Sequence, residues 1–231
     1  MSHANLDMKP RRLSRKAIVR KSEIENGASF LLGDVADVVE GTIDLLSPIH
    51  FKDSWRLVEG ICIRAVEGTV IPHEQVRAWE IIEEKQRRVY RLSDRDIVVG
   101  LVRPERRNIG MLMDEGKDVV ATTDGTAVVR VRPKNGLGIT QEYLFAALRS
   151  EDSRIQLWTE SGGTSYGKLN RDHILNLRIR KPGSEELKRI SKSVVDWRHS
   201  TIASMDSWKK IGTADDRTPI VNSPMFGLEP Y

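Results

Sequence analysis

The chain of 231 residues has one cysteine, Cys62, and no hydrophobic run that approaches the length of a membrane-spanning helix. A single cysteine excludes an intrachain disulfide and any metal cluster held by several thiolates. No signal peptide is recognisable, so the sequence predicts a cytoplasmic protein. Aromatic residues make up only 6% of the chain, but 39% hydrophobic residues are enough for a folded core.

A catalytic constellation is also lacking. The five histidines are scattered without the spacing of metal ligands, and Cys62 has no neighbouring base in the sequence. Glu83-Glu84-Lys85 contains the acid-x-lysine pair of metal-dependent nucleases, but a charged, solvated segment explains it better. We therefore expect a protein that is not an enzyme, with no metal and no cofactor. A magnesium-dependent nuclease that uses Glu83 and Lys85 is the weaker alternative.

The stretch "SGGTSYGKLN" (161–170), called the lysine loop below, nearly matches a nucleotide-binding phosphate loop. Such a loop needs a Ser or Thr after its lysine to hold Mg²⁺, and a helix behind it. Here Leu169 follows Lys168, and the next residues predict a strand. We therefore expect the lysine loop to contact a phosphate without hydrolysing a nucleotide.

The charge is nearly balanced, with 37 Lys and Arg against 33 Asp and Glu and a formal net charge of +4. Residues 1–22 are an exception, because they hold seven Lys or Arg and one acid, Asp7. They predict a basic, flexible arm. The arm is either a solvated tail or a segment that lies along nucleic-acid phosphates.

Short valine-rich runs bounded by Asp, Gly and Pro predict strands in a domain of residues 23–182. They cover residues 96–102, 118–123 and 126–133, and a closing strand is expected at 173–182. A helix capped by Thr140 is expected at 141–150, whereas residues 73–90 fit helix or extended chain. The fold class is therefore predicted to be α+β, with a β-rich, barrel-like domain.

A long helix is predicted at residues 183–212, with Ser184 as N-cap and Gly212 at its end. Apolar residues follow a 3-4-3-4 spacing with a small polar break at Thr201 and Ser204. This apolar seam fits a coiled coil or an amphipathic helix docked on its own domain, and its length favours a partner helix. Residues 213–231 are read as a flexible tail. The apolar positions of the seam are Leu187, Ile190, Val194, Trp197, Trp208 and Ile211.

Three polar, basic loops separate the predicted elements and favour DNA binding over ordinary turn chemistry. They are residues 100–110, 132–138 and 161–171, the last of which contains the lysine loop. Arginine and lysine bind phosphates, and arginine and asparagine can also read base edges. We expect phosphate contacts from Arg106, Arg107 and Lys168, and base choice from Arg103, Asn108, Asn135 or Tyr166. The candidate DNA-binding residues are Arg103, Arg106, Arg107, Asn108, Lys134, Asn135, Thr164, Ser165, Tyr166, Lys168 and Asn170.

Five segments in order resemble the target recognition domain of type I restriction-modification specificity subunits. The resemblance covers about residues 30–211. It is carried by "FLLGDVADVVEGT" (30–42), "YRLSDRDIVVGLVRP" (90–104), "VVATTDGTAVVRVRP" (119–133), "ITQEYLFAALRSEDSRIQLWTESGGTS" (139–165) and "KLNRDHILNLRIRKP" (168–182).

The resemblance implies a domain that reads double-stranded DNA, followed by a spacer helix at 183–212 that pairs with another helix and docks methyltransferase or restriction subunits. Family members usually carry two recognition domains, whereas this chain has one, so the resemblance implies a half-subunit, with a homodimer through the helix as one form. It also implies a role in a restriction-modification or related phage-defence system. A protein–protein adaptor or DNA mimic is the alternative, although a mimic should be acidic.

Overall fold

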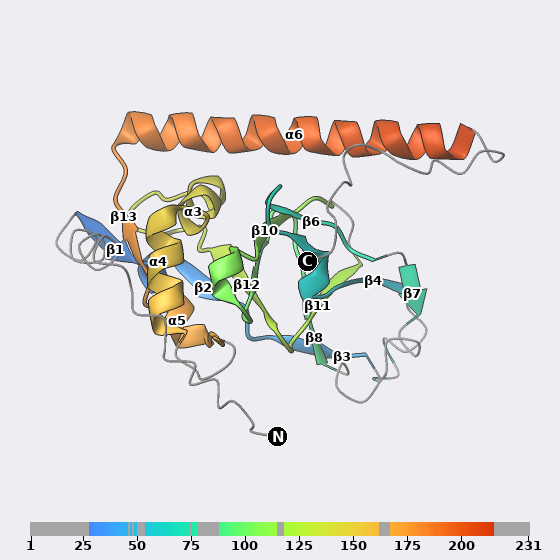
Figure 1. Cartoon of the computed structure of the whole chain (residues 1–231), viewed down its shortest axis with the longest axis horizontal. Helices are drawn as coiled ribbons and strands as arrows, with labels where there is room; N and C mark the ends of the chain where they lie inside the picture. The colour runs from blue at the N-terminus through green and yellow to red at the C-terminus, as the bar shows by residue number, and fades with distance from the viewer. Residues whose placement is uncertain are drawn as a thin grey trace, which may run out of the picture.

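The structure is a computed structural model that describes residues 28–45, 47, 49, 54–73, 75–77, 88–114, 118–161 and 167–214. For residues 75–77 and 208–214 only the backbone is described. The predicted arm at 1–22 and residues 215–231 of the predicted tail lie outside this range. The described residues confirm a mixed α+β architecture (Figure 1).

A six-stranded sheet forms the middle layer, in the order β2-β12-β9-β10-β6-β5. Its neighbouring strands are antiparallel except β10 and β6, which are parallel. The expected strands at 96–102 and 126–133 are β9 and β12. The strands are β2 (Ala36–Val38), β5 (Ile63–Arg64), β6 (Thr69–Val70), β9 (Ile97–Gly100), β10 (Ile109–Leu112) and β12 (Thr126–Val131).

A five-stranded sheet, ordered β3-β8-β11-β4-β7, and a pair, β1-β13, complete the described strands. Each sheet is open at both ends, so the described strands form no closed barrel, and the barrel-like expectation is not confirmed. The ambiguous residues 73–90 contain β7 and β8, while 78–87 lie outside the described residues. The bounds are β1 (Ser29–Leu31), β3 (Thr42–Asp44), β4 (Ser54–Val58), β7 (Gln75–Arg77), β8 (Arg88–Arg91), β11 (Val119–Thr122) and β13 (Arg178–Arg180).

Strand β9 is buried on both faces, which explains its uninterrupted apolar sequence. Ile97 and Val99 belong to the core that the middle sheet forms with the helices. Val98 points the other way, into the core shared with Val119 and Ala121 of the five-stranded sheet. Alternate side chains of β9 thus point into two different hydrophobic cores. The domain has three layers, which are the helices, the six-stranded sheet and the five-stranded sheet.

The described helices lie mainly against one face of the middle sheet (Figure 1). Thr140 accepts a hydrogen bond from the Tyr143 N–H at 3.1 Å, which confirms it as the N-cap of α3. The helical elements are α2 (Leu32–Val35), α3 (Gln141–Leu148), α4 (Glu151–Glu160), α5 (Arg171–Leu175), α6 (Ser184–Ala214) and the 3₁₀ turns η1 (Gly60–Cys62) and η3 (Pro104–Arg106).

The expected strand at 173–182 is wrong in its first half. Helix α5 occupies Arg171–Leu175, and only Arg178–Arg180 form strand β13. Asn170 decides the outcome locally, because its side chain accepts a hydrogen bond from the His173 N–H at 2.9 Å and caps α5. A short run of alternating Ile and Leu does not separate strand from helix without that cap.

Helix α6 crosses the domain as one long rod (Figure 1). It begins at Ser184, and the Leu187 N–H donates to the Gly183 carbonyl at 2.9 Å. Gly183 therefore occupies the cap position expected for Ser184, a shift of one residue. The helix continues past the expected end at Gly212 to Ala214.

The first half of the apolar seam packs on the chain's own domain. Leu187, Ile190, Val194 and Trp197 are half-buried against the core that the helices share with the middle sheet. The Trp197 ring stacks on Phe145 of α3 with centroids 5.3 Å apart. These residues therefore follow the docked-helix alternative. The side chains of Trp208 and Ile211 lie outside the described residues, so a partner helix stays a prediction.

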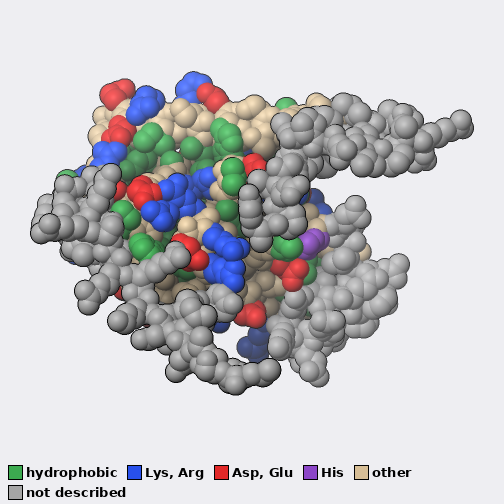
Figure 2. All heavy atoms as spheres, viewed as in Figure 1, with side chains coloured by type: hydrophobic (Ala, Val, Ile, Leu, Met, Phe, Trp, Pro, Cys, Tyr) green, Lys and Arg blue, Asp and Glu red, His purple; other side chains and the backbone are tan. Residues whose placement is uncertain are grey.

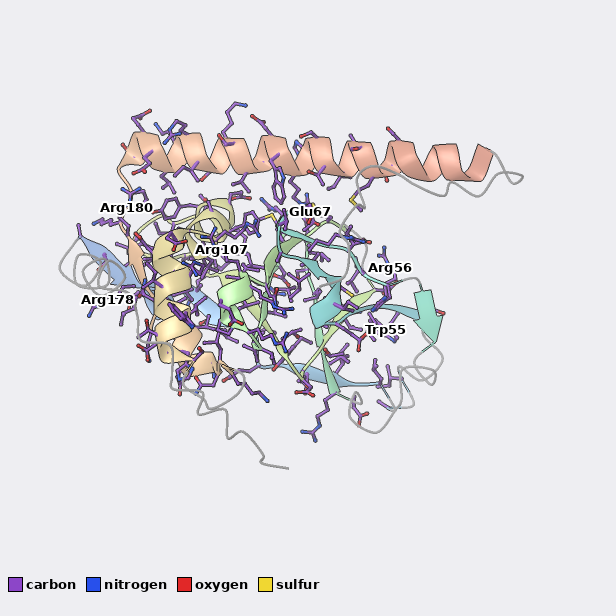
Figure 3. The ribbon with its side chains drawn as sticks, viewed as in Figure 1. Trp55, Arg56, Glu67, Arg107, Arg178 and Arg180 are labelled. Carbon is purple, nitrogen blue, oxygen red and sulfur yellow. The ribbon has the colours of Figure 1, made fainter. Side chains whose placement is uncertain are left out.

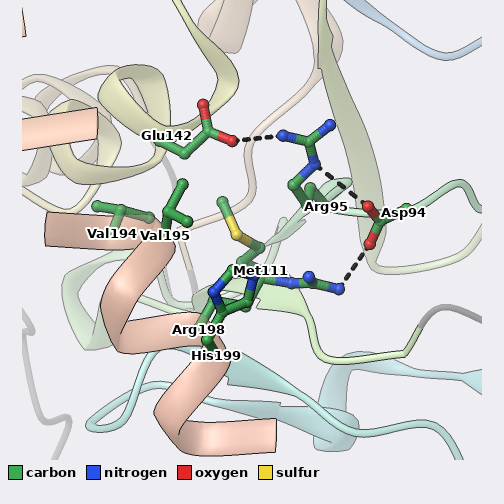
Figure 4. Close-up of a pocket in the computed structure, with 8 residues that line it drawn as sticks. All are labelled: Asp94, Arg95, Met111, Glu142, Val194, Val195, Arg198 and His199. Carbon is green, nitrogen blue, oxygen red and sulfur yellow. Dashed lines mark hydrogen bonds and ion pairs between the residues drawn. The ribbon is translucent and has the colours of Figure 1, made fainter. Parts of the chain in front are cut away.

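A line of charges joins α6 to the segment before β9 (Figure 4). The side chain of Arg198 is 5% exposed and donates to Asp94 Oδ1 at 2.5 Å and to the Leu112 carbonyl at 3.3 Å. Arg95 binds Asp94 at 3.2 Å and Glu142 of α3 at 2.8 Å. This ion network, Glu142–Arg95–Asp94–Arg198, borders a cavity of about 160 Å³ and fixes the middle of α6 on the domain.

The two ends of the Asp94–Arg198 pair should differ in their effect on stability. Asp94→Asn leaves a buried guanidinium without that carboxylate, whereas Arg198→Met leaves a carboxylate that is 44% exposed and hydrated. We expect Asp94→Asn to lower the free energy of unfolding by about 1–3 kcal/mol, and Arg198→Met to lower it less. Urea denaturation measures both values, and a larger loss for Arg198→Met would contradict the assignment.

Candidate nucleic-acid interface

Two of the three predicted DNA-binding loops lie side by side. Residues 101–108, which contain η3 and are called the η3 loop below, pair with the end of the lysine loop through an antiparallel bridge between Val102 and Lys168. The Arg103 N–H donates to the Gly167 carbonyl at 3.0 Å, and the Leu169 N–H donates to the Leu101 carbonyl at 2.8 Å. The backbone thus brings together cations that lie more than 50 residues apart in the sequence.

The η3 loop holds its arginines on a tightly bent backbone. Arg103 and Arg107, on either side of η3, have φ values of 56° and 55°. This left-handed conformation costs a non-glycine residue on the order of 1 kcal/mol or more, and persists where surrounding contacts enforce it. Here the Arg106 and Arg107 N–H groups close the turn on the Arg103 and Pro104 carbonyls, both at 3.0 Å. The turn leaves the side chain of Arg106 exposed.

Exposure differs among the other predicted contacts of these two loops. Lys168 is exposed, whereas Arg103 and Asn108 are half-buried. The Asn108 side chain donates to the Val102 carbonyl at 3.4 Å within its own loop. Leu169, the residue that takes the place of a metal-binding hydroxyl, is 2% exposed and anchors the lysine loop in the core. Figure 2 shows Lys and Arg side chains gathered beneath the long helix on the face that it draws.

Arg107, labelled in Figure 3, does not stand alone, because it pairs with Glu151 in the first turn of α4. Arg154 binds the same carboxylate, with Nε 2.9 Å from Oε2. The hydrogen bond from Arg154 lowers the pKa of Glu151, and the charges of Arg154 and Arg107 lower it further. The carboxylate is therefore ionised at neutral pH. A phosphate that binds Arg107 must compete with it.

The third predicted loop lies elsewhere. Lys134 and Asn135 follow β12 at the end where Val129 pairs with Ile97, while the η3 loop follows Gly100 at the other end of β9. The length of β9 separates them, about 13 Å. Asn135 closes its own loop, because its side chain binds the Arg132 carbonyl at 3.0 Å and the Ile139 carbonyl and N–H at 2.9 and 2.8 Å. Lys134 is exposed.

The remaining predicted residues have different outcomes. Thr164, Ser165 and Tyr166 lie outside the described residues. Asn170 is exposed, but its side chain caps α5. The two arginines of the strand at 126–133 are paired with acids: Arg130 forms two hydrogen bonds with the buried Asp96, and Arg132 binds Asp37 at 3.0 Å.

Sequence patterns indicated no role for Arg149, which lies at the C-terminal end of α3. Its guanidinium donates to the carbonyls of Ala65, Ile109 and Val66 at 2.9, 2.7 and 3.0 Å, and lies over the Phe145 ring. Burial lowers the pKa of Arg149, and the charge of nearby Arg107 lowers it further. A lone arginine after a helix carries no signal of such a role. Only the chain's folding brings the three carbonyls to it.

Two absences apply only to the part of the chain that the structure describes. No group of three or more His, Cys, Asp or Glu side chains there has a geometry that would hold a metal ion. No helix there combines the length and apolar character needed to cross a membrane. Glu83 and Lys85, the candidate nuclease residues, lie outside it.

No protein-family model and no curated protein matches the sequence. Among solved structures, the HsdS subunit from Thermoanaerobacter tengcongensis matches with a TM-score of 0.57 and 22% sequence identity, over 79% of this chain and 43% of that chain. The chain has the fold of part of an HsdS subunit. A structure from work on complex assembly and conformational transition of the type I R-M system matches with a TM-score of 0.57 and 22% identity, over 80% of this chain and 44% of that chain.

The likeness to HsdS confirms the expected resemblance to a target recognition domain at the level of the fold. The chain spans less than half of the length of either matched structure. The likeness therefore concerns the fold of one portion of the HsdS subunit. The joined η3 and lysine loops carry two exposed cations, Arg106 and Lys168, on backbones that hydrogen bonds hold together.

Proposed function

We propose that the protein binds DNA sequence-specifically as the specificity component of a restriction-modification or related phage-defence system, without catalysis of its own. The observation that carries the proposal is the bridge between Val102 and Lys168, which joins two cationic loops on an HsdS-like domain. Cations held on a fixed backbone bind phosphates with little loss of conformational freedom. The protein would act in the cytoplasm, where its DNA substrate lies.

The residues divide by exposure into two proposed roles. Arg106 and Lys168 are exposed and are assigned to phosphates, and Arg107 joins them once it leaves Glu151. Arg103 and Asn108 are half-buried in the η3 loop and are assigned to base edges, together with Tyr166. Asn108 differs from Asn135 because its side chain makes one long hydrogen bond within its own loop, at 3.4 Å, rather than three shorter ones. Lys134 is a further phosphate contact only if the duplex also reaches the far end of β9. Asn135, whose side chain binds its own loop, is withdrawn from base reading.

Removing one phosphate contact should change both affinity and salt dependence. We expect Arg106→Gln and Lys168→Gln each to weaken binding to a site selected from a random duplex pool, and to reduce the slope of log K against log salt by about 0.9. Fluorescence anisotropy at several salt concentrations measures both. Lys188→Gln on α6 removes the same charge from an exposed helix position and is the matched control. A wild-type protein that selects no motif, or whose binding ignores salt, would refute the proposed function.

Glu151 should restrain DNA binding, because its carboxylate occupies the guanidinium of Arg107. Glu151→Gln removes the competing charge, and an exposed ion pair of this kind is worth up to about 1 kcal/mol. We expect two- to fivefold tighter binding, on the order of what that energy allows. Glu185→Gln, which frees Lys188 on α6, is the control for a general change in net charge. Equal gains for both variants would show that Arg107 has no special part.

The assembly proposed for the chain follows from its share of the HsdS length. One recognition domain and one long helix supply half of a paired reader, so a second copy would supply the other half. Methyltransferase or restriction subunits would dock on the resulting helix pair. The second half of α6, which includes Ser204, Trp208 and Ile211, is the proposed contact between copies, because Val194 and Trp197 already pack on the domain.

This assembly predicts the mass and the preferred site together. Light scattering should give the mass of two chains, and selected sites should contain two inverted half-sites with a gap. Val194→Asp and Trp197→Asp are unsuitable tests, because they would disrupt the docking of α6 on its own domain. A single chain that selects one uninterrupted site would contradict the paired form and leave DNA reading intact.

A further inference from the structure

The hairpin β5–β6 ends in a rigid tip, residues Ala65–Gly68. Its register pairs Ile63 with Val70 and Arg64 with Thr69. The tip closes through the Gly68 N–H, which donates to the Arg64 carbonyl at 2.8 Å, and Gly68 has a φ of 77° that favours glycine. A Cβ at Gly68 would also lie 2.7 Å from Cζ of Arg149. The tip is therefore shaped to lie directly against this guanidinium.

Arg149 fixes the tip from beneath. Its two terminal nitrogens bind the Ala65 and Val66 carbonyls, and the Met111 N–H binds the Gly68 carbonyl at 2.9 Å. Three of the four tip carbonyls are thus held on the domain side. The side chain of Val66 nevertheless remains outside the core, with 80% of the residue exposed.

The same guanidinium connects the hairpin tip to the η3 loop. Arg149 Nη1 also binds the carbonyl of Ile109, two residues after Arg107. Figure 3 labels Glu67 of the tip and Arg107 of the η3 loop, both beneath α6. The tip therefore borders the proposed DNA-binding loops and keeps a fixed position relative to them.

The chemistry of the tip does not suit a phosphate. Val66 offers only methyl groups, and the exposed carboxylate of Glu67 repels an anion. Both groups suit base edges in the major groove, where thymine presents its C5-methyl group and cytosine its N4 amino group. A two-stranded β-ribbon also has the width that this groove admits. An exposed valine by itself is ordinary on a protein surface, but this one is rigidly held beside cations.

We propose that the β5–β6 tip enters the major groove and reads base edges, with Val66 against the methyl group of a thymine and Glu67 accepting a hydrogen bond from the amino group of a cytosine. Arg149 is the positioning residue that sets the tip against the η3 loop. This proposal rests on the proposed DNA binding and adds a third loop to it. Sequence reasoning did not assign a role to residues 65–68.

The decisive experiment combines protein and DNA substitutions. Each thymine of the selected site is replaced in turn by uracil, which lacks only the C5-methyl group, and binding is measured with wild-type protein and with Val66→Ala. At one thymine the wild type should lose about fourfold in affinity, the value of one buried methyl group. Val66→Ala should bind the unmodified site several-fold more weakly and lose nothing further at that position, because the contact is already gone.

Two controls separate a contact from a general effect. Ile61→Ala removes another exposed apolar side chain, 81% exposed on η1 before β5, and should bind as the wild type does. Arg149→Lys keeps the charge but cannot bind three carbonyls with one planar fork. It should relax the preference at the Val66 and Glu67 positions while the salt slope stays unchanged, whereas a loss of folding would appear in thermal unfolding. Glu67→Gln should relax the preference for one cytosine.

The outcomes are distinct. The proposal for the tip is overturned if every uracil substitution lowers the affinity of Val66→Ala as much as that of the wild type. It is also overturned if Val66→Ala and Ile61→Ala weaken DNA binding equally. Wild-type binding that depends on Arg106 and Lys168 would then leave the proposed function standing. Unchanged DNA binding of Val66→Ala, with loss of binding to a methyltransferase subunit, would make the tip a protein contact and also overturn the proposal. Failure of the wild type to select any site would refute the proposed function itself.

Discussion

The burial of β9 between two hydrophobic cores is the constraint on which the rest of the structure depends. Because Ile97 and Val99 face the helices and Val98 faces the second sheet, a shift of β9 by one residue would move each side chain into the opposite core, which is packed around other side chains. Asp96 fixes the start of the strand, since its buried carboxylate binds Arg130 and the Ser93 N–H. The chain leaves this fixed strand at Gly100 and enters the η3 loop. The rigidity of the loop thus begins in the core.

Helix α6 is tied to the opposite end of the same strand. Arg198 reaches into the domain to Asp94 and the Leu112 carbonyl, and Trp197 stacks on Phe145. Apolar packing supplies the contact area, while the charged contacts select one position of the helix along the domain. An amphipathic stripe alone would tolerate neighbouring positions. The pairing of a buried guanidinium with one carboxylate does not.

Much of the fold could be predicted from residue patterns, because local rules determine it. Alternation and bounding turns located β9, β11 and β12, and Thr140 marked the start of α3. The prediction of a strand at 173–182 was wrong because the apolar spacing there fits both the period of a strand and that of a helix. The side chain of Asn170 caps the first turn and so favours the helix. The apolar seam predicted an amphipathic helix, but the same spacing fits packing against a partner helix and packing against the chain's own domain. Only the position of α3 beneath α6 distinguishes them.

The candidate site was less predictable, because its geometry depends on contacts distant in sequence. The pairing of Val102 with Lys168 brings two predicted loops together, and β9 keeps Asn135 away from them. In the sequence, Asn135 looks like an asparagine that reads a base, because it stands beside a lysine in a polar loop. In the structure, its side chain hydrogen-bonds to its own loop. Arg149 had no signal, since its three carbonyl partners come from two remote segments. Residue type indicates what a side chain can bind, and only the fold determines what is within its reach.

The ion network Glu142–Arg95–Asp94–Arg198 and the η3 loop lie at opposite ends of β9 and share no side-chain contact among the described bonds. Substitutions in the η3 loop therefore leave the charged contacts between α6 and the domain unchanged. Under the proposed function, a change in these loops would alter the DNA sequence that the protein reads without moving the long helix on the domain.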